Sequence, residues 1–319
     1  MLNLSNKNLE FLKAQIPLIT LLSLVVIVGI SEPAFFTRST LLVVIADTTT
    51  LFLMSAGATF VILMGGIDLS VQAVASLISV IVAALLPEYG FFAILIAILA
   101  AALSGFSGGI AHHILKIPSF IATLAISGVV ASAAFWLSDE RQIYIAPELR
   151  DKYLSWATGE TFGIQSEIVV SVVILAALLL IQLRTTFGRF VKAIGFGEQA
   201  VIASGIHVPR IKMLAFTLSG AMAGLSGVVF AARMSSGSPT LANEFLLPSI
   251  AAIIVGGTAL TGGYGSIWRT FLGALIISVV RVGMTFVGIS VYAQQIVFGM
   301  VLVVAVAITI DRSRITIVK

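Results

Sequence analysis

Cysteine is absent and charged residues are scarce: Asp, Glu, Lys and Arg make up 10% of the 319 residues, whereas 59% are hydrophobic. Without cysteine the chain has no disulfide bond, no thiolate nucleophile and no cysteine-ligated metal. Soluble domains carry about 25% charged residues, so the composition excludes a water-soluble globular protein. The mean hydropathy of +1.14 indicates a protein whose surface faces lipid.

Signatures of nucleotide binding, metal catalysis and nucleic-acid binding are missing too. The sequence contains neither the G-x-x-x-x-G-K-[ST] phosphate loop nor the H-E-x-x-H zinc motif. The net charge is only +4 and is dispersed along the chain, so no basic patch indicates nucleic acid as a partner. We therefore expect a chain that is not an enzyme and that holds no cofactor or metal of its own.

Long apolar runs are what the sequence does have. They lack the alternation of a lipid-facing β-strand, so helices are the structure that satisfies the backbone in lipid. At about 20 residues per span, residues 1–319 are expected to form a single transmembrane domain, an all-α polytopic membrane protein with about ten helices, some broken or short. The candidate spans are Ile16–Ile30, Leu41–Met64, Val71–Leu86, Phe91–Ile110, Phe120–Leu137, Ile168–Leu183, Ile211–Ala232, Leu246–Leu260, Phe271–Ile289 and Gln294–Ile310.

Two of these runs, Val71–Leu86 and Leu246–Leu260, are short or flanked by glycine pairs, so we expect a break or a tilt in them. Basic residues in the loops predict the orientation of the bundle. The segment 184–212 holds five basic residues and one acid and is expected in the cytoplasm, whereas the segment 138–167 holds six acids and three basic residues and is expected outside. Counting spans from these two segments places both termini in the cytoplasm.

Two glycine clusters interrupt the apolar runs, Gly-Gly-Ile-Asp-Leu-Ser at residues 65–70 and Gly-Gly-Thr-Ala-Leu-Thr-Gly-Gly-Tyr-Gly at residues 256–265. Such sequence indicates unwound backbone, which is tolerated in a membrane only where protein or water surrounds it. A substrate pathway and a tight structural turn are both compatible with it. We expect the clusters to approach each other, with Asp68 or Ser70 capping the next helix. The pathway or gate candidates are Gly65, Gly66, Asp68, Ser70, Gly256, Gly257, Thr258, Gly262 and Gly263.

Glycines also form a stripe at Gly220, Gly224 and Gly227, on one face of a helix. In lipid such a stripe favours close helix packing within one bundle, with a moving or subunit interface as the alternative. Asp47, Asp68 and Arg281 are the charges nearest to the interiors of the spans and are candidates for function. The sequence identifies no partner for Asp47 or Arg281.

The basic segment 184–212 can form a short amphipathic helix from Glu198 to about Ser204, in which Ala200 and Ala203 lie beside apolar residues. A compact helix of this kind is suited to docking into a groove on a soluble partner. Resting flat in the lipid interface is the alternative.

Three stretches of the sequence together form a recognisable combination. They are Gly65-Gly66-Ile67-Asp68-Leu69-Ser70-Val71; Thr186-Phe187-Gly188-Arg189 with Ala193-Ile194-Gly195 and Ser204-Gly205-Ile206; and Ala232-Arg233-Met234-Ser235-Ser236 with Pro239-Thr240, Ile250–Thr258 and Gly262-Gly263. From about residue 16 to 311 their order and spacing resemble the membrane permeases of bacterial ABC importers of the ribose, xylose, galactose and arabinose type. Gln72, Leu247 and Tyr264 depart from the pattern of that family.

The resemblance implies a multi-pass permease of the bacterial inner membrane that works by alternating access. Its partners would be a periplasmic sugar-binding protein, cytoplasmic ABC ATPase subunits that bind ATP and Mg, membrane lipid, and a second permease, usually its own copy, with a heterodimer as the alternative. Segment 138–167 would be periplasmic and segment 184–212 would be the cytoplasmic coupling loop. The residues that contact the ATPase would be Gly195, Glu198, Ala200, Ser204 and Gly205.

Two alternatives stay open on the sequence. The same importer architecture could carry a nucleoside, a branched-chain amino acid or a signalling molecule. A secondary carrier or channel driven by an ion gradient would instead use Asp47, Asp68 and Arg281 as relay groups.

Overall fold

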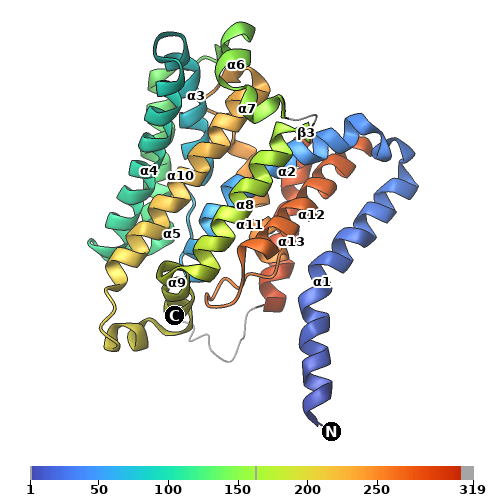
Figure 1. Ribbon diagram of the computed structural model, residues 1–319, viewed down its shortest axis with the longest axis vertical. Coiled ribbons are helices and arrows are strands. Elements are labelled where there is room, and N and C mark those ends of the chain that lie inside the picture. The colour runs from blue at the N-terminus through green and yellow to red at the C-terminus, as the bar shows by residue number, and fades with distance from the viewer. Residues whose placement is uncertain (1, 162–163, 310–319) are drawn as a thin grey trace.

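The computed structural model describes residues 2–161 and 164–309, with side chains described for residues 15–160 and 164–304. Almost all of this chain is helical, and the helices stand side by side as a bundle (Figure 1). The elements are α1 (Leu2–Ser31), η1 (Pro33–Phe36), α2 (Arg38–Leu63), α3 (Val71–Tyr89), α4 (Phe91–His113), α5 (Ser119–Leu137), β1 (Ile143–Tyr144), α6 (Pro147–Tyr153), α7 (Ser155–Thr158), β2 (Glu160–Thr161), β3 (Ile164–Gln165), α8 (Ser166–Arg184), α9 (Thr186–Ala203), α10 (Val208–Met234), β4 (Ser236–Gly237), η2 (Asn243–Phe245), α11 (Leu246–Val255), α12 (Ile267–Phe286) and α13 (Val291–Thr309).

In the described residues, seven helices are long and apolar enough to cross a membrane: α2, α3, α4, α5, α8, α10 and α12. Three shorter apolar helices lie at residues 15–31, 243–255 and 291–304. Each predicted span falls on one of these helices, and Ile310, the predicted end of the last span, lies outside the described residues. The prediction of a helical polytopic membrane protein is therefore confirmed.

The helix ends differ from the prediction at the second glycine cluster. α11 ends at Val255, although the apolar run continues to Leu260, because Gly256 and Gly257 follow it and Gly257 has a φ of +94° that glycine adopts without steric cost. α12 begins at Ile267, where the hydroxyl of Ser266 accepts a hydrogen bond from the Arg269 N–H at 3.3 Å. α3 is a continuous helix of 19 residues. The short helix expected here is therefore confirmed for α11, whereas α3 has no break.

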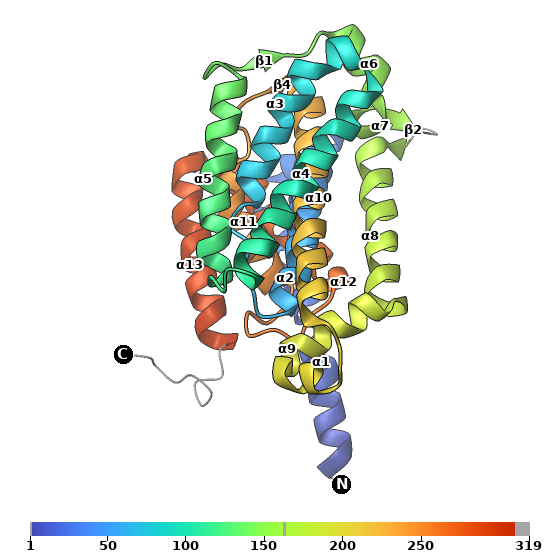
Figure 2. The same ribbon diagram turned by 90° about the vertical axis from the view of Figure 1, so that its left-hand side faces the viewer.

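α10 is the central helix and packs against α2, α3 and α4 (Figure 2). Its glycine stripe faces these neighbours: a Cβ at Gly220 would overlap the carbonyl oxygen of Ala101 on α4, and one at Gly227 would overlap that of Ala75 on α3. Gly105 on α4 would likewise clash with the Phe216 carbonyl oxygen. The predicted role of these glycines in close packing within the bundle is confirmed.

The polar segments gather at opposite ends of the bundle. α9 lies at the end where α1 begins, whereas α6, α7 and the β1–β4 pair lie at the other end (Figures 1 and 2). β1 and β4 pair antiparallel with Ile143 opposite Gly237, which ties the segment after α5 to the segment after α10. Segments 138–167 and 184–212 therefore face opposite sides of the bundle, as the loop charges predict.

Candidate functional site

α9 consists of two helical halves that meet at Gly197. The backbone of Gly197 is extended, with φ 178° and ψ 91°, which breaks the helix between Phe196 and Glu198. The first half begins at Thr186, where the Thr185 hydroxyl accepts a hydrogen bond from the Gly188 N–H at 3.2 Å. The helix expected from Glu198 onward is present. The preceding half was not predicted, which corrects the interpretation of this segment as a loop with one short helix.

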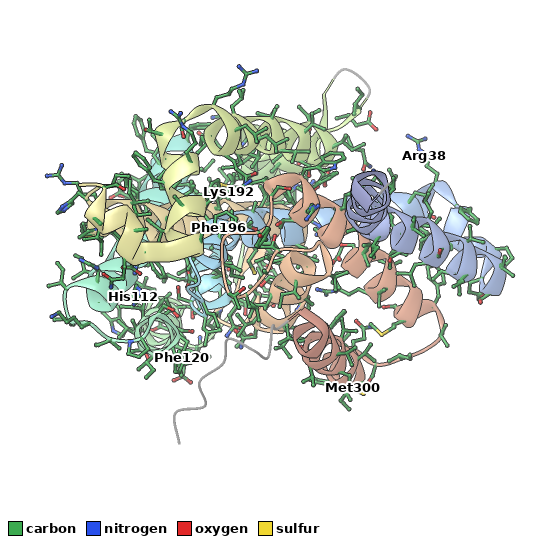
Figure 3. The ribbon with its side chains drawn as sticks, turned by 90° about the horizontal axis from the view of Figure 1, so that it is seen from below. Arg38, His112, Phe120, Lys192, Phe196 and Met300 are labelled. Carbon is green, nitrogen blue, oxygen red and sulfur yellow. The ribbon has the colours of Figure 1, made fainter. Side chains whose placement is uncertain are left out.

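The second half of α9 is held by an ion pair and presents small side chains outward. Lys212 of α10 donates hydrogen bonds to both carboxylate oxygens of Glu198 at 2.8 Å. Ala200 and Ser204 are exposed, and Gly205 follows with a φ of +76°. Figure 3 views the bundle from this end, with α9 across its face. A groove of about 540 Å³ runs along α9, bordered by residues of both halves such as Arg189, Ala193 and Ala200.

The first half of α9 touches both predicted glycine clusters. Gly195 lies so close to the Leu63 carbonyl oxygen and to the Gly263 nitrogen that a Cβ would overlap both atoms. Gly262, with a φ of +85°, packs against the Gly65 nitrogen and the Gly195 Cα. Gly263 donates a backbone hydrogen bond to Leu63 at 2.8 Å. We call Gly65, Gly195, Gly262 and Gly263 the glycine junction.

The expected approach of the two clusters is therefore confirmed at the glycine junction, but not for all of their residues. A Cβ at Gly256 would overlap the Arg269 carbonyl oxygen, so this glycine packs against α12 instead. Thr258 is fully buried, and its hydroxyl has no hydrogen-bond partner in the described part of the chain. Gly66 packs against Val61 and lies near the Ser119 hydroxyl of α5.

Asp68 is buried, with 2% of its surface exposed, and its carboxylate accepts three hydrogen bonds. The donors are the N–H and the hydroxyl of Ser70, at 2.9 and 2.6 Å, and the hydroxyl of Ser219 on α10, at 2.7 Å. Asp68 therefore binds the residue that precedes α3 and joins it to the central helix. Neither side chain makes a capping hydrogen bond to the first turn of α3, because the hydroxyl of Ser70, its N-cap residue, donates to Asp68; the expectation that one of them caps this helix is therefore wrong.

Side chains of α5 satisfy the unwound backbone that precedes α3. The Ile67 N–H donates to the Ser119 hydroxyl and the Leu69 N–H to the Thr123 hydroxyl, both at 3.0 Å. An unpaired amide in a dry membrane protein interior costs several kcal/mol, so these bonds hold the irregular segment in one conformation. The first glycine cluster is therefore a hydrogen-bonded crossing between α2 and α3 and not an open loop.

An aromatic contact next to the glycine junction was not predicted. The rings of Phe196 and Tyr264 meet edge to face with centroids 4.8 Å apart. Both side chains are exposed, 60% and 67% respectively, at the end of the bundle that carries α9. Sequence alone offers no signal that pairs two residues 68 positions apart.

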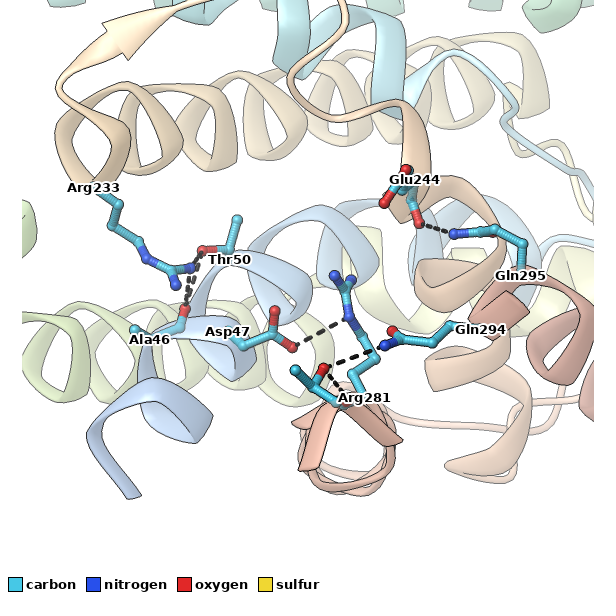
Figure 4. Close-up of polar contacts among 9 residues, drawn as sticks. Ala46, Asp47, Thr50, Arg233, Glu244, Arg281, Gln294 and Gln295 are labelled. Atoms are coloured by element: carbon cyan, nitrogen blue, oxygen red, sulfur yellow. Dashed lines mark hydrogen bonds and ion pairs between the residues drawn. The ribbon is translucent and has the colours of Figure 1, made fainter. Parts of the chain in front are cut away.

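Asp47 and Arg281, for which the sequence identified no partner, pair with each other. Arg281 Nε lies 3.8 Å from Asp47 Oδ2, and the guanidinium stacks over the Phe245 ring at 3.9 Å (Figure 4). Arg233 lies beside this pair and donates to the Ala46 carbonyl oxygen and the Thr50 hydroxyl at 2.9 and 2.8 Å. These groups lie toward the end of the bundle that carries α6 and α7, away from the glycine junction.

Comparison with known proteins identifies the family. The family model described as the permease component of the branched-chain amino acid transport system matches residues 40–306. The chain belongs to this permease family. The permease is 35% identical to the ribose import permease protein of Haemophilus influenzae over 93% of both chains, and 33% identical to the fructose import permease protein of Rhizobium meliloti over 92% of this chain and 84% of that one. It is 35% identical to the L-arabinose transport system permease protein of Escherichia coli over 60% of this chain and 58% of that one.

The resemblance to the permeases of ABC sugar importers, which the sequence indicated, is therefore confirmed. No solved structure matches the permease.

Proposed function

We propose that this permease is the membrane subunit of an ATP-binding-cassette importer and forms the translocation pathway for a monosaccharide. A periplasmic binding protein delivers the sugar, and a separate cytoplasmic ATPase, which binds ATP and Mg, drives transport. The names of relatives that are 33% or 35% identical refer to ribose, fructose and arabinose, which supports a sugar over a nucleoside, a branched-chain amino acid or a signalling molecule.

The observation that carries the proposal is the contact of α9 with both glycine clusters. Gly195 contacts backbone atoms at the end of α2 and in the loop between α11 and α12. No side chain lies between α9 and these segments at this point. A displacement imposed on α9 from the cytoplasm therefore reaches the clusters directly. This is the arrangement that an importer driven by a soluble ATPase requires.

The second half of α9 is the proposed coupling helix. Its small exposed residues, Ala200, Ser204 and Gly205, permit close approach of a partner surface, while the Glu198–Lys212 ion pair anchors the helix to α10. Gly195 transmits the motion to the glycine junction. The groove along α9 offers the ATPase a concave apolar surface beside this helix.

The two glycine clusters are the proposed gate, with Asp68 as a structural residue. All three hydrogen bonds that Asp68 accepts come from within the chain, so direct contact with solute is not needed to explain this buried carboxylate. In the same way, Asp47 is explained by Arg281. These partners favour the importer over an ion-coupled carrier, in which the same groups would act as relays.

The proposed topology has ten spans, with the three shorter apolar helices added to the seven long ones. Both termini and segment 184–212 lie in the cytoplasm, and segment 138–167 lies in the periplasm, in agreement with their basic and acidic residues. The protein is then a multi-pass inner-membrane protein, and two copies, each with an ATPase subunit, form the importer.

Transport and basal ATP hydrolysis of three variants in the full complex test the gate. We expect Gly66→Val and Gly257→Val to change at least one of the two rates, because a side chain at Gly257 is strained at its positive φ and one at Gly66 meets Val61. Parental rates in both would identify the clusters as ordinary turns. We expect Asp68→Asn to leave the sugar preference unchanged. A shift in preference at an unchanged basal rate would identify Asp68 as a solute contact.

A further inference from the structure

The segments α2, α11 and α12 contact one another at both ends of the bundle. At the end that carries α9, the Leu63 carbonyl oxygen of α2 accepts the hydrogen bond from Gly263, in the loop between α11 and α12. Toward the other end, Arg281 of α12 pairs with Asp47 of α2 and stacks over the ring of Phe245, which directly precedes α11 (Figure 4). We call Asp47, Phe245 and Arg281 the outer contact. The same segments are therefore joined by the glycine junction at one end and by the outer contact at the other.

Between the two ends, the polar contacts of α2 with its neighbours are complete. The hydroxyls of Thr59 on α2 and Thr270 on α12 lie 2.8 Å apart and share a hydrogen bond. The Ser55 hydroxyl of α2 donates to the Ser249 carbonyl oxygen of α11 at 3.1 Å. Both bonds are buried, so they hold α2 to α11 and α12 in a defined register.

The outer contact, by contrast, is incomplete. Arg281 Nε lies 3.8 Å from Asp47 Oδ2, whereas a charge-assisted hydrogen bond is about 2.7–2.9 Å long. Asp47 Oδ2 and Arg281 Nη1 are buried and have no hydrogen-bond partner among the side chains that the structure describes. The same holds for the hydroxyls of Thr48 on α2 and Ser278 on α12. Burying such groups unpaired is costly, so another arrangement of α2 and α12 would satisfy them better.

Neighbouring polar side chains are bound elsewhere. Arg233 donates through one nitrogen to two groups of α2, and Gln294 donates to the Thr285 hydroxyl at 3.2 Å (Figure 4). The missing bonds of the outer contact are therefore most directly made within the pair itself. A small shift of α12 against α2 would place the Arg281 guanidinium on the Asp47 carboxylate with two parallel N–H···O bonds, the geometry that these two groups prefer.

We propose that the outer contact is a second gate of the permease, which closes when the glycine junction opens. The proposal rests on the proposed function, because alternating access needs a gate at each end of the bundle and the two are not open together. In the present structure the glycine junction is packed backbone to backbone, while the ion pair of the outer contact is loose. This is the combination expected when the inner gate is closed.

The position of the Thr59–Thr270 hydrogen bond explains how the two gates are linked. Thr270 is close to the start of α12, whereas Arg281 lies about 16 Å further along the helix at 1.5 Å per residue. If α12 turns about this hydrogen bond, a small displacement of its first residues gives a larger and opposite displacement at Arg281. Separation of the segments at the glycine junction thus presses Arg281 towards Asp47.

Phe245 keeps the guanidinium oriented for this closure. The ring lies 3.9 Å from the guanidinium carbon, and stacking on an aromatic face is a property of arginine that depends on its planar head group. A lysine at residue 281 would keep the positive charge but could not offer two parallel donors. Arg281→Lys therefore separates closure of the gate from the mere presence of a cation.

Two distances measured by spin labelling test the proposal on the purified permease in nanodiscs, since the chain has no native cysteine. Ser39→Cys and Phe286→Cys are exposed, line one groove between α2 and α12, and report the outer end. Thr261→Cys and Leu115→Cys are exposed at the other end and report the inner one. Gly195→Val is added to each pair, because its side chain forces the glycine junction apart.

We expect Gly195→Val to lengthen the inner distance and to shorten the outer distance. Gly128→Ala, where an added Cβ meets nothing within 4 Å, is the control and changes neither. With Arg281→Lys added, the inner distance still lengthens but the outer distance no longer shortens. The same label pairs without Gly195→Val are also compared in the full complex with and without a non-hydrolysable ATP analogue. There too the two distances should change in opposite directions, which covers the case that Gly195→Val does not fold.

Sugar uptake by the full complex provides a second readout. Arg281→Lys is expected to lower the maximal rate about tenfold, as for the loss of one charge-assisted bond. The sugar concentration that gives half of this rate should stay the same, because the binding protein and not the outer contact captures the sugar. A purely structural role of Arg281 would not produce this separation together with the loss of the outer distance change.

An outer distance that stays constant in both measurements, or that lengthens together with the inner distance, would overturn the proposal. Arg281→Lys with parental uptake and an unchanged outer response would overturn it as well. Either result leaves the importer function untouched, because uptake still depends on the ATPase. Uptake that does not depend on the ATPase, with the two distances still moving in opposite directions, would instead overturn the proposed function and leave the two linked gates in place.

Discussion

The Cα of Gly195 in α9 lies directly against the carbonyl oxygen of Leu63 at the end of α2, with no room for a Cβ between them. The same carbonyl accepts the hydrogen bond from Gly263, so one backbone oxygen joins the end of α2 to the second glycine cluster and to α9. Any side chain at residue 195 must push these segments apart. These neighbours are backbone atoms, which cannot move aside as easily as the end of a flexible side chain.

Gly195→Val is expected to abolish ATP hydrolysis stimulated by the loaded binding protein and to reduce uptake, because the valine displaces α9 from the glycine junction. The control is Gly128→Ala on α5, where an added Cβ meets nothing within 4 Å. Both variants are measured in proteoliposomes with the partner subunits, after size-exclusion chromatography shows intact protein. Stimulation at the parental level in Gly195→Val would mean that this contact does not carry coupling.

Ala200→Glu tests the coupling helix itself. Ala200 is exposed on the second half of α9, so the larger charged side chain leaves the fold intact but blocks close approach of a partner. We expect stimulated ATP hydrolysis to be lost while the amount of permease in the membrane is unchanged. Lys116→Glu, an exposed position at the same end of the bundle, serves as the control and retains stimulation. If stimulated ATP hydrolysis is as fast in Ala200→Glu as in Lys116→Glu, α9 is not the coupling helix.

The long helices could be predicted because each contains a continuous apolar run. The first half of α9 has no such run and could not be predicted. Residues 186–196 contain two glycines, which lower the intrinsic preference for a helix. Tertiary packing supplies what propensity lacks: Val191 is fully buried, and Phe187 packs against Phe60 of α2 with ring centroids 5.6 Å apart. No local pattern contains that information.

The features of the candidate site that could be predicted are those whose interacting residues lie close together in the sequence. The Gly-Gly pairs mark unwound backbone, and Asp68 is two residues from the Ser70 N–H that it binds. Its second partner, Ser219, is 151 residues away, and Asp47 and Arg281 are farther apart still in the sequence. A single sequence does not encode which of many distant residues meet in space, so these partners required the structure.

Asp47 and Arg281 form an ion pair, and we expect the loss of Asp47 to cost more stability than the loss of Arg281. Asp47→Asn leaves Arg281 and Arg233 as two buried cations with no acid between them, and should lower the free energy of unfolding by about 3 kcal/mol or more. Arg281→Gln should cost less, because Arg233 still attracts Asp47. The measurement is thermal and denaturant unfolding in detergent. A larger loss in Arg281→Gln than in Asp47→Asn would contradict this account of the charges.

The double variant Asp47→Asn/Arg281→Gln completes a thermodynamic cycle for this pair. We expect it to lose less stability than the sum of the single variants, because the second change removes a charge that the first left unpaired. Additive losses would show that the two side chains, 3.8 Å apart, do not interact.

Orientation can be measured with introduced cysteines, since the native chain has none. Glu148→Cys on α6 and Gln199→Cys on α9 are both exposed and lie at opposite ends of the bundle. A membrane-impermeant thiol reagent added to intact cells with a permeable outer membrane should label Glu148→Cys only. Gln199→Cys should be labelled only after the inner membrane is opened. The reverse pattern would overturn the topology and the coupling helix with it.

The most direct test of the importer is uptake of labelled sugar into proteoliposomes that contain the permease, its ATPase and its binding protein. The binding protein is first screened against a sugar panel by thermal shift to identify the substrate. We predict that uptake requires all three components and ATP inside the proteoliposomes, on the side of the ATPase and opposite the binding protein. An imposed proton or sodium gradient does not replace them. Uptake by the permease alone, driven by an ion gradient, would contradict the account.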